Sequence, residues 1–198
     1  MVDDNQKDRW RRYYDALYAV AIELGQSLEP EAVLQQLVRG VVRTLGLRAV
    51  SIRLLTADGL LEPVAVEGLS SEYLKKGPVD VARSVIDREA LEGRPVQVAD
   101  VTFDPRFEYP AEAKREGIVS AVFVPLIARG QSIGVLRAYT GERRTFTQDE
   151  MELLVALANL GALAIANARL YQICVRDQQM TAEALWHFRL PNELIGRT

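Results

Sequence analysis

The order of elements expected for residues 93–171 constrains the fold of this chain more than any other feature. The stretch reads as a strand, a loop with a short helix, two more strands and a long helix. The last two strands, at residues 118–127 and 132–139, are separated by Ala128-Arg129-Gly130-Gln131, a connection short enough for a hairpin. Any fold for the chain must accommodate this order.

Helical spacing occurs in four longer segments. From residue 7 to about 28, apolar residues recur every three or four positions and place one stripe along a helix. Pro30 suits the first position of a second helix, which Gly46 ends, and residues 79–94 are helical in spacing with a stop at Gly93. Thr147 and Glu150 form a capping box before the last helix, which no proline interrupts up to residue 187.

Three further segments are expected to complete the chain between these helices. Residues 48–70 predict two strands around Asp58-Gly59, a pair favoured in hairpin turns because both residues tolerate positive φ. Residues 95–101 predict a third strand. Pro110 suits the start of a short helix that Gly117 closes.

Composition excludes several classes of partner and site. The net charge is only −3 and the 24 basic residues are dispersed, which is not the basic footprint of a nucleic-acid binder. The single Cys174 cannot form an intramolecular disulfide or a cysteine-based zinc cluster, so a reducing cytoplasm is expected. The N-terminus is unlike a signal peptide, and no uninterrupted apolar run predicts a membrane span.

The chain resembles the GAF domain family over roughly residues 28–171. The strings that carry the resemblance are ADVTFDPRFEYPAEAKREGIVSAVFVPLI, GQSIGVLRAYTGERRTFTQDEMELL and ALANLGALAIANARLY. The resemblance implies an α+β fold: an antiparallel sheet of five or six strands with the terminal helices on one face and a pocket roofed by loops and helices on the other. Residues 1–28 would be an N-terminal helix, 29–171 the GAF-like domain and 172–198 a C-terminal helical extension.

The best-defined chemistries of this family are not expected here. Cyclic-nucleotide binders carry an Asn-Lys pair followed by Phe and an Asp-Glu pair, but here two residues rather than three lie between Phe146 and Asp149-Glu150, and the preceding Asn-Lys pair is missing. Bilin binders and methionine sulfoxide reductases use pocket cysteines, whereas Cys174 lies beyond the domain. We therefore expect no catalytic residue, no cofactor and, with one histidine in the chain, no metal site.

Strand alternation selects candidate ligand-binding residues. Successive side chains of a strand point to opposite faces, so Ser51 and Arg53 separate from Val50 and Ile52. The same reasoning places Arg137 with Tyr139 and separates Ser120 from its neighbours. Loop aromatics could wall the same pocket. The full candidate set is Ser51, Arg53, Phe103, Phe107, Tyr109, Ser120, Arg137 and Tyr139.

Two guanidinium groups on a covered sheet face require an anion, because a buried charge is costly unless it is paired. One reading supplies that anion from within the chain, and the other supplies it from the carboxylate or phosphate of a ligand. The carboxylates considered for internal pairing are Glu62, Glu67, Asp100, Asp104 and Glu108.

The terminal helices predict a homodimer. The last helix has a weak heptad pattern, and the first helix carries the apolar stripe, so the two could pair with their copies in a four-helix bundle. The alternative is that both stripes cover their own domain. The residues expected at the dimer interface are Trp10, Leu17, Leu24, Leu153, Leu157, Leu160, Ala164, Asn167 and Tyr171.

Together these patterns favour a non-enzymatic sensory module in the cytoplasm. It would bind a small, possibly anionic ligand and relay a change in helix packing to a downstream signalling protein. The alternative is a dimerisation scaffold without a ligand, and an enzyme with an unfamiliar site is the third reading.

Overall fold

The computed structural model describes residues 4–26 and 29–187, with the side chains of residues 7–22 and 29–174. Its longer helices are α1 (Asp4–Gln26), α2 (Pro30–Leu45) and α6 (Gln148–His187). Three shorter helices occur between the strands, namely α3 (Ser71–Leu74), α4 (Val85–Leu91) and α5 (Pro110–Glu116). The predicted boundaries at Pro30 and Gly46 are confirmed, and Gly46 adopts the left-handed conformation that ends a helix.

Six strands form one antiparallel sheet with the order β3-β2-β1-β6-β5-β4. Their bounds are β1 (Ala49–Leu55), β2 (Leu60–Glu67), β3 (Val79–Asp80), β4 (Val96–Val98), β5 (Ser120–Ala128) and β6 (Gln131–Thr140). The two hairpins, β1 with β2 and β5 with β6, meet because β1 pairs with β6 at the centre of the sheet. The α+β sheet expected from the sequence is therefore confirmed, with six strands.

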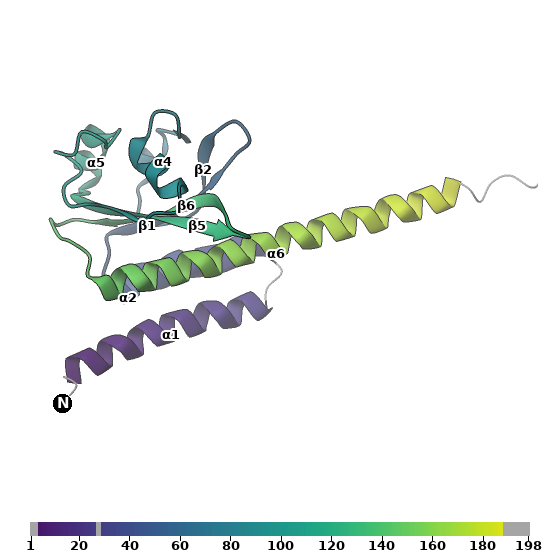
Figure 1. The fold of residues 1–198 in the computed structure, drawn as a ribbon, viewed down its shortest axis with the longest axis horizontal. Helices are drawn as coiled ribbons and strands as arrows, with labels where there is room; N and C mark the ends of the chain where they lie inside the picture. The colour runs from purple at the N-terminus through teal and green to yellow at the C-terminus, as the bar shows by residue number, and fades with distance from the viewer. Residues whose placement is uncertain (1–3, 27–28, 188–198) are drawn as a thin grey trace, which may run out of the picture.

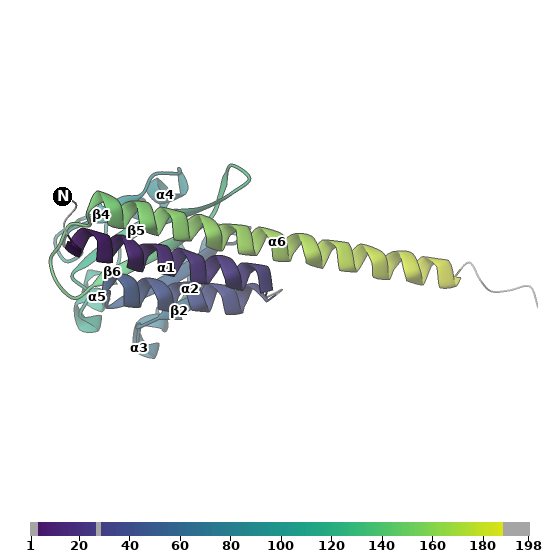
Figure 2. The same cartoon turned by 90° about the horizontal axis from the view of Figure 1, so that it is seen from below.

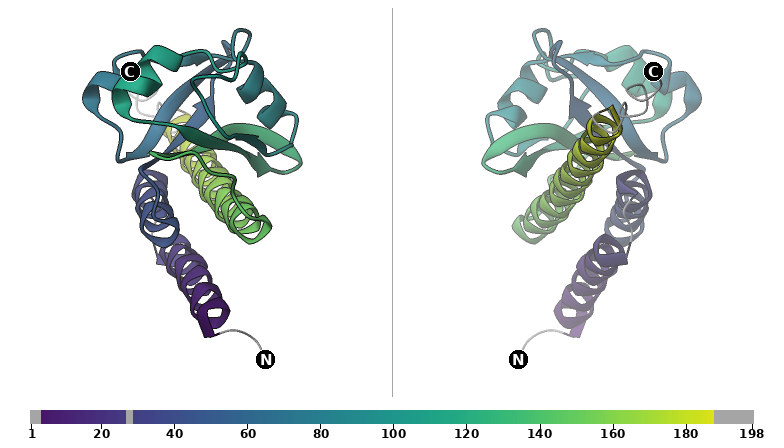
Figure 3. Two further views of the ribbon diagram at one scale, coloured as in Figure 1. Left: turned by 90° about the vertical axis from the view of Figure 1, so that its left-hand side faces the viewer. Right: turned by 90° about the vertical axis from the view of Figure 1, so that its right-hand side faces the viewer.

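The molecule is layered, as Figure 1 shows. Helices α3, α4 and α5 and their loops cover one face of the sheet and are called the roof below. Helices α2 and α6 cover the other face, and α1 packs on α2 and α6 as an outer layer (Figure 2). The C-terminal half of α6 continues beyond the sheet, which leaves it without cover from the domain (Figures 1 and 3).

Each sheet face contributes to its own apolar core. On the helix side, Ile52, Val124 and Leu136 pack with α2 and α6 residues such as Leu37 and Leu157. On the roof side, the cluster includes Ala121, Phe123, Val135 and Tyr139 from the sheet and Tyr73, Ile86 and Ala113 from the roof. The central strands are thus buried on both faces, which explains why β5 reads as a nearly continuous apolar run.

The capping box predicted for the last helix is present. The Thr147 amide donates to Glu150 Oε2 at 2.9 Å, and the Glu150 amide donates to Thr147 Oγ1 at 3.3 Å. These bonds satisfy two amide groups at the start of α6. The helix then runs for 40 residues to His187, as the absence of proline predicts.

One predicted helix is corrected. Residues 79–94 were expected to be helical throughout, but Val79–Asp80 forms β3 against the tip of the β1–β2 hairpin, and α4 covers only Val85–Leu91. The Asp80 carboxylate accepts the Ala82 amide at 2.9 Å, which favours a turn over a helix at this point. The short α3, capped by Ser70 Oγ, was not predicted.

A second correction concerns membrane-spanning potential. Within the described residues, Gln148–Cys174 is long and apolar enough to cross a membrane by length and composition alone, which the sequence analysis did not recognise. In the structure, Leu153, Leu154 and Leu157 of this segment are buried against the sheet. The apolar character of α6 is therefore used in the core.

Candidate functional site

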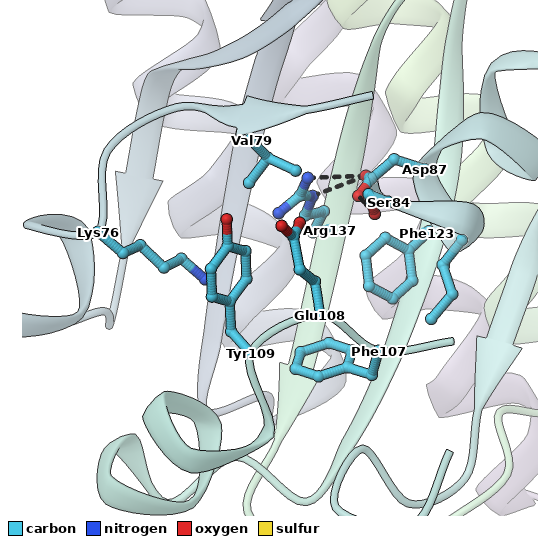
Figure 4. A pocket seen from close by; sticks show the side chains of 10 residues that line it. Lys76, Val79, Ser84, Asp87, Phe107, Glu108, Tyr109, Phe123 and Arg137 are labelled. Atoms are coloured by element: carbon cyan, nitrogen blue, oxygen red, sulfur yellow. Dashed lines mark hydrogen bonds and ion pairs between the residues drawn. The ribbon is translucent and has the colours of Figure 1, made fainter. Parts of the chain in front are cut away.

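A pocket lies between the roof-side face of the sheet and the roof, and we call it the roof-side pocket (Figure 4). Strands β5 and β6 provide its floor with Phe123 and Arg137, whereas its other walls come from β3, α4 and the loops before β3 and α5. Its polar lining residues are Lys76, Ser84, Asp87, Glu108, Tyr109 and Arg137.

Arg137 is held by a buried ion pair with α4. Its Nε donates to Asp87 Oδ1 at 3.0 Å, and its Nη2 lies 2.8 Å from the same oxygen. Ser84 Oγ donates to the other oxygen of Asp87 at 2.5 Å. Burial alone would lower the pKa of Arg137, but the Asp87 carboxylate, together with Tyr139 and Tyr73, outweighs it, so the pKa is raised. Arg137 is therefore a permanently charged group with an internal counter-ion.

Arg53 is a second buried cation with a different environment. Only 1% of the residue is exposed, and its Nη1 donates to the carbonyls of Leu61 at 3.0 Å and Gly77 at 3.4 Å. Its Nε has no hydrogen-bond partner in the described part of the chain. Burial, followed by the nearby Arg137, lowers the pKa of Arg53. Carbonyl oxygens solvate this guanidinium in part, but no described carboxylate forms a salt bridge with it.

Lys76 is the third cation, and it enters from the loop after α3. Its Nζ lies 3.7 Å from the ring centroid of Tyr73 and 4.6 Å from that of Tyr109. Burial, then Arg137 and Arg53, lowers the pKa of Lys76 from 10.5 to about 7. The two rings oppose this change: at about 2 kcal/mol for each desolvated cation–π contact and about 1.36 kcal/mol per pKa unit, they offset much of it. The rings therefore reduce the lowering without reversing it.

The carboxylates near the pocket do not neutralise all three cations. Asp87 pairs with Arg137. Glu108 also lines the pocket, where its carboxylate lies beside Arg137 (Figure 4), and its Oε1 is 3.2 Å from Nε of Arg83, a residue outside the lining; neither Glu108 oxygen has a hydrogen-bond partner among the described residues. Among the residues that the structure describes, no salt bridge reaches Arg53 or Lys76. Two partly or fully buried cations therefore remain available to an anion.

The roof leaves little room in this conformation. The space between the lining side chains is about 10 Å³, which is about what one water molecule occupies. Phe107 and Phe123 meet edge to face at 6.5 Å and close one end. A ligand larger than water must displace a roof side chain to enter.

The sheet register brings together four of the residues singled out from the sequence. Ser51 pairs with Arg137 and Ala49 pairs with Tyr139 across β1 and β6, while Arg53 follows Ser51 on the same face. Ser51, Arg53, Arg137 and Tyr139 are all buried. Ser51 Oγ lacks a hydrogen-bond partner among the described residues, but of these four residues only Arg137 lines the roof-side pocket, and Ser51, Arg53 and Tyr139 lie outside its lining.

The loop aromatics separate into two groups. Phe107 and Tyr109 line the roof-side pocket. Phe103, by contrast, is 83% exposed and is not part of the pocket lining. Phe103 follows a turn in which Asp100 accepts the Thr102 amide at 3.0 Å, and this turn directs the loop outward.

The prediction that Ser120 faces the pocket is also wrong. It has the same strand parity as Val122 and Val124, which belong to the helix-side core. Its Oγ donates to the Glu142 carbonyl at 2.6 Å and accepts the Arg144 amide at 2.9 Å. Ser120 therefore fastens the loop after β6 rather than facing the pocket. Strand alternation failed here because β5 is apolar on both faces.

The internal counter-ion was not among the carboxylates considered from the sequence. Glu67 pairs with Arg39, Asp104 with Arg106, and Asp100 accepts from Thr102. Glu62 is exposed. Asp87 and Lys76 were missed because both lie in short roof segments whose position depends on tertiary packing. The one available signal was the Ser-x-x-Asp spacing of Ser84 and Asp87, which is typical of a helix start.

A second cleft of about 130 Å³ lies between α3 and α5 and is lined by Ser70, Glu72, Tyr73, Glu112, Arg115 and Glu116. Glu116 accepts the Ser70 amide at 2.8 Å and the Ser70 hydroxyl at 2.5 Å. This pair of bonds ties together the two roof helices that flank Lys76 and Tyr109. The cleft is therefore a structural junction of the roof.

The residues expected at a dimer interface have mixed positions. Leu153, Leu157 and Ala164 are buried in the core of the chain itself, and Leu17 and Leu160 pack against that core. The prediction that Leu153, Leu157 and Ala164 lie at a dimer interface is therefore wrong, because the apolar stripe of α6 covers the sheet of its own chain. The exposed members of the set are Trp10, Asn167 and Tyr171, whereas the side chain of Leu24 lies outside the described residues.

The fold and the pocket define an antiparallel α+β domain with a small roofed cavity on one face of the sheet and helices at both ends. The family model described as GAF domain matches residues 29–165 of the chain. The chain therefore belongs to the GAF domain family.

Known proteins with similar sequence or structure include regulatory proteins and enzymes. The Nif-specific regulatory protein of Azospirillum lipoferum is 25% identical over 185 residues, which cover 90% of this chain and 28% of that protein. The GAF domain of a phosphoenolpyruvate-protein phosphotransferase from Coxiella burnetii is 23% identical with a TM-score of 0.73, covering 82% of this chain and 98% of that one. The chain spans less than a third of the curated relative, and the structural likeness shows the fold.

A solved enzyme has the same fold. The free methionine-R-sulfoxide reductase from Neisseria meningitidis is 20% identical with a TM-score of 0.68, covering 80% of this chain and 91% of that one. The family match thus shows membership of the GAF domain family, and the sequence relative named above is a regulatory protein.

Proposed function

We propose that this GAF domain binds a small anion in the roof-side pocket. Binding would change the packing of the terminal helices, which form a homodimer. The observation that carries the proposal is the pair of cations, Arg53 and Lys76, that have no carboxylate partner among the described residues. Burying a charge without a counter-ion is unfavourable, so an anionic ligand gains by neutralising them. The compartment we propose is the cytoplasm.

Ligand entry gives a physical route to the helices. An anion that contacts Arg137 competes with Asp87 and so loosens the tie between β6 and α4. Strands β5 and β6 lie directly on α6, which in turn contacts α1. We propose that a shift of the sheet changes the packing of α1 on α6, and that a separate or covalently linked signalling partner reads this change.

The proposed dimer surface lies on the outer layer. Trp10, Tyr14, Tyr18 and Ile22 recur every four residues on α1 and are 46%, 64%, 55% and 39% exposed. The rings of Tyr14 and Tyr18 stack at 5.9 Å, and the Trp10 ring lies edge to face on the buried Tyr13, also at 5.9 Å. An exposed aromatic stripe of this length favours burial against a second copy.

The first test is the unfolding temperature of the full chain across a panel of small carboxylates, phosphates and nucleotides. A ligand at 100 times its Kd stabilises the fold by about 2.7 kcal/mol, which moves the midpoint by about 5–11 °C in a chain of this size. We expect a shift for at least one anion that disappears in Arg53→Ala. Arg94→Ala is the matched control, since Arg94 is exposed and pairs only with Glu92. A shift that survives Arg53→Ala contradicts the assigned site.

A dimerisation scaffold without a ligand is the second candidate. The internal pair of Arg137 with Asp87 and the small space under the roof favour it. The same panel separates the two functions, because a scaffold shows no anion-dependent shift while its unfolding temperature still depends on protein concentration.

A further inference from the structure

We infer that the side chain of Glu108 occupies the carboxylate position of the roof-side pocket, and that the ligand is a small monocarboxylate which enters in exchange for this side chain. The inference rests on the proposed anion site and deepens it. It assigns Glu108 as the internal competitor of the ligand, and a carboxylate group as the part of the ligand that the pocket recognises.

Glu108 is buried without the hydrogen bonds that a carboxylate needs. Its side chain is only 12% exposed, and neither of its oxygens has a hydrogen-bond partner among the described residues. Its ion pair is with Nε of Arg83 at 3.2 Å, and the side chain of Arg83 is 71% exposed, so solvent weakens this pair. Because a buried charge without hydrogen bonds is unfavourable, a better-placed carboxylate can replace Glu108.

The guanidinium of Arg137 is the group that such a carboxylate would meet. Figure 4 shows the Glu108 carboxylate beside it. Arg137 Nη2 lies 2.8 Å from Asp87 but has no hydrogen-bond partner in the described part of the chain. A free carboxylate is not tied to the loop backbone, so it can turn to accept from Nη2, and a charge-assisted hydrogen bond of this kind is a strong one.

Charge balance favours exchange over addition. The lining contains two cations, Lys76 and Arg137, and two carboxylates, Asp87 and Glu108. An anion that entered beside Glu108 would face its negative charge, whereas a monocarboxylate that replaces Glu108 keeps the balance. The two cations thus remain paired with the same number of anions throughout.

The size and polarity of the pocket select the rest of the ligand. The space left in the closed pocket is about 10 Å³, so room comes chiefly from the carboxyl and methylene groups that Glu108 withdraws. The apolar part of the lining is Val79, Ile86, Phe107 and Phe123. We therefore expect a monocarboxylate with a short apolar tail.

The chain around Glu108 allows a local exchange. Residues 107–109 are consecutive and all line the pocket. On one side of them, Arg106 is held by Asp104 at 2.7 Å and by Glu89 at 3.2 Å, and on the other side Pro110 begins α5. Movement of Glu108 can therefore be confined to a strap between two fixed points.

The test is calorimetric titration of the full chain and of its Glu108→Ala variant with acetate, which has the size of the group that this substitution removes beyond Cβ. We expect Glu108→Ala to bind acetate at least about tenfold more tightly than the parent, because the competing carboxylate is gone and a hydrogen bond to a charged group is gained. Acetamide is the control ligand, since it has the same shape without the charge. Glu108→Asp is the control variant, since it keeps a carboxylate, and it should show no gain.

Equal gains with acetate and acetamide, or equal gains in Glu108→Ala and Glu108→Asp, overturn the inference. If Glu108→Ala does not fold alone, circular dichroism replaces calorimetry. Recovery of the fold in acetate, but not in acetamide or sodium chloride, is then the expected result, and no recovery in acetate is the contrary one.

The anion panel on the parent keeps this inference distinct from the proposed function. If anions stabilise the parent but Glu108→Ala gains no affinity for acetate, the role of Glu108 is wrong and the anion site stands. If acetate binds Glu108→Ala but the parent responds to no anion, anion sensing and the exchange are both wrong, and Glu108 is a permanent internal occupant.

Discussion

Three buried or partly buried cationic side chains between the sheet and the roof differ in the groups that surround their charge. Arg137 has its own carboxylate, Arg53 has backbone carbonyls, and Lys76 has two aromatic rings. Each arrangement reduces the cost of burial to a different extent, and only Arg137 is neutralised within the described chain. The cations without a carboxylate partner are therefore Lys76, which lines the pocket, and Arg53, which is buried outside its lining.

Asp87→Asn is expected to destabilise the fold by about 3–5 kcal/mol, because it leaves the charge of Arg137 buried without its counter-ion. Chemical denaturation of both proteins measures the difference. Glu92→Gln is the control, since Glu92 forms an exposed pair that contributes at most about 1 kcal/mol. Equal effects of the two substitutions would show that the Asp87 ion pair is not a major stabilising contact.

The lowered pKa of Lys76 predicts that the free energy of unfolding rises with pH. Its pKa is about 7 in the folded protein and near 10.5 when exposed, so the unfolded state binds more protons between these values. The free energy of unfolding should therefore increase from pH 7 towards pH 10, and Lys76→Met should flatten this increase. The charged or titratable groups around Lys76 are Tyr73, Tyr109, Arg53, Arg137, Asp87 and Glu112. An unchanged slope in Lys76→Met, with Lys75→Met as control, contradicts the lowered pKa.

Strand alternation placed Arg53, Arg137 and Tyr139 on one face because β1 and β6 are paired in register. It could not find Asp87 or Lys76, since their approach to the sheet depends on how the roof folds over it. It misplaced Ser120 because both faces of β5 are buried, and a lone serine then marks neither face.

At the scale of elements, α6 has two roles along its length. Its first half supplies Leu153, Leu154 and Leu157 to the helix-side core. Farther along, Leu163, Leu170, Tyr171 and Ile173 are exposed where the helix leaves the domain. The capping box and the missing proline predicted this helix well, but one apolar stripe could not reveal which half covers the chain's own sheet.

The close pairing of β1 with β6 depends on Gly134. A Cβ at this position would lie 2.2 Å from the carbonyl oxygen of Arg53. Gly134→Ala is expected to cost about 3 kcal/mol or more, since the two strands must separate. Gly40→Ala in α2 is the control, because a Cβ there meets no atom within 4 Å and should stabilise the helix by about 0.5–1 kcal/mol. Denaturant titration gives both values, and a Gly134→Ala variant as stable as the parent would contradict this packing.

At the scale of the molecule, the chain combines a roofed pocket on one side of a sheet with a helical layer on the other. The family resemblance predicted this arrangement from sequence strings, and the family match confirms it. The occupant of the pocket and the geometry of a dimer depend on contacts outside the chain. Sequence patterns therefore predicted the sheet and the layers that cover it better than they predicted the residues of the pocket.

The dimer proposal predicts that Tyr14→Glu combined with Tyr18→Glu makes the protein monomeric, because charges would replace the exposed stacked rings. Analytical ultracentrifugation over a range of concentrations measures this. Phe103→Glu is the control, since Phe103 is also an exposed aromatic residue but lies on a loop at the roof side. A dimer that persists in the double variant would show that α1 does not form the interface.

The most direct measurement is the ¹H–¹⁵N NMR signal of the Arg53 Nε–H group during titration with small anions and with bicarbonate. Assignment follows from its loss in Arg53→Lys. Because Arg53 Nε has no partner in the described structure, we predict that its signal moves when an anion enters, while that of the exposed Arg88 does not. If neither anions nor bicarbonate move the Arg53 signal in the folded protein, the pocket is not an anion site and the domain acts as a scaffold.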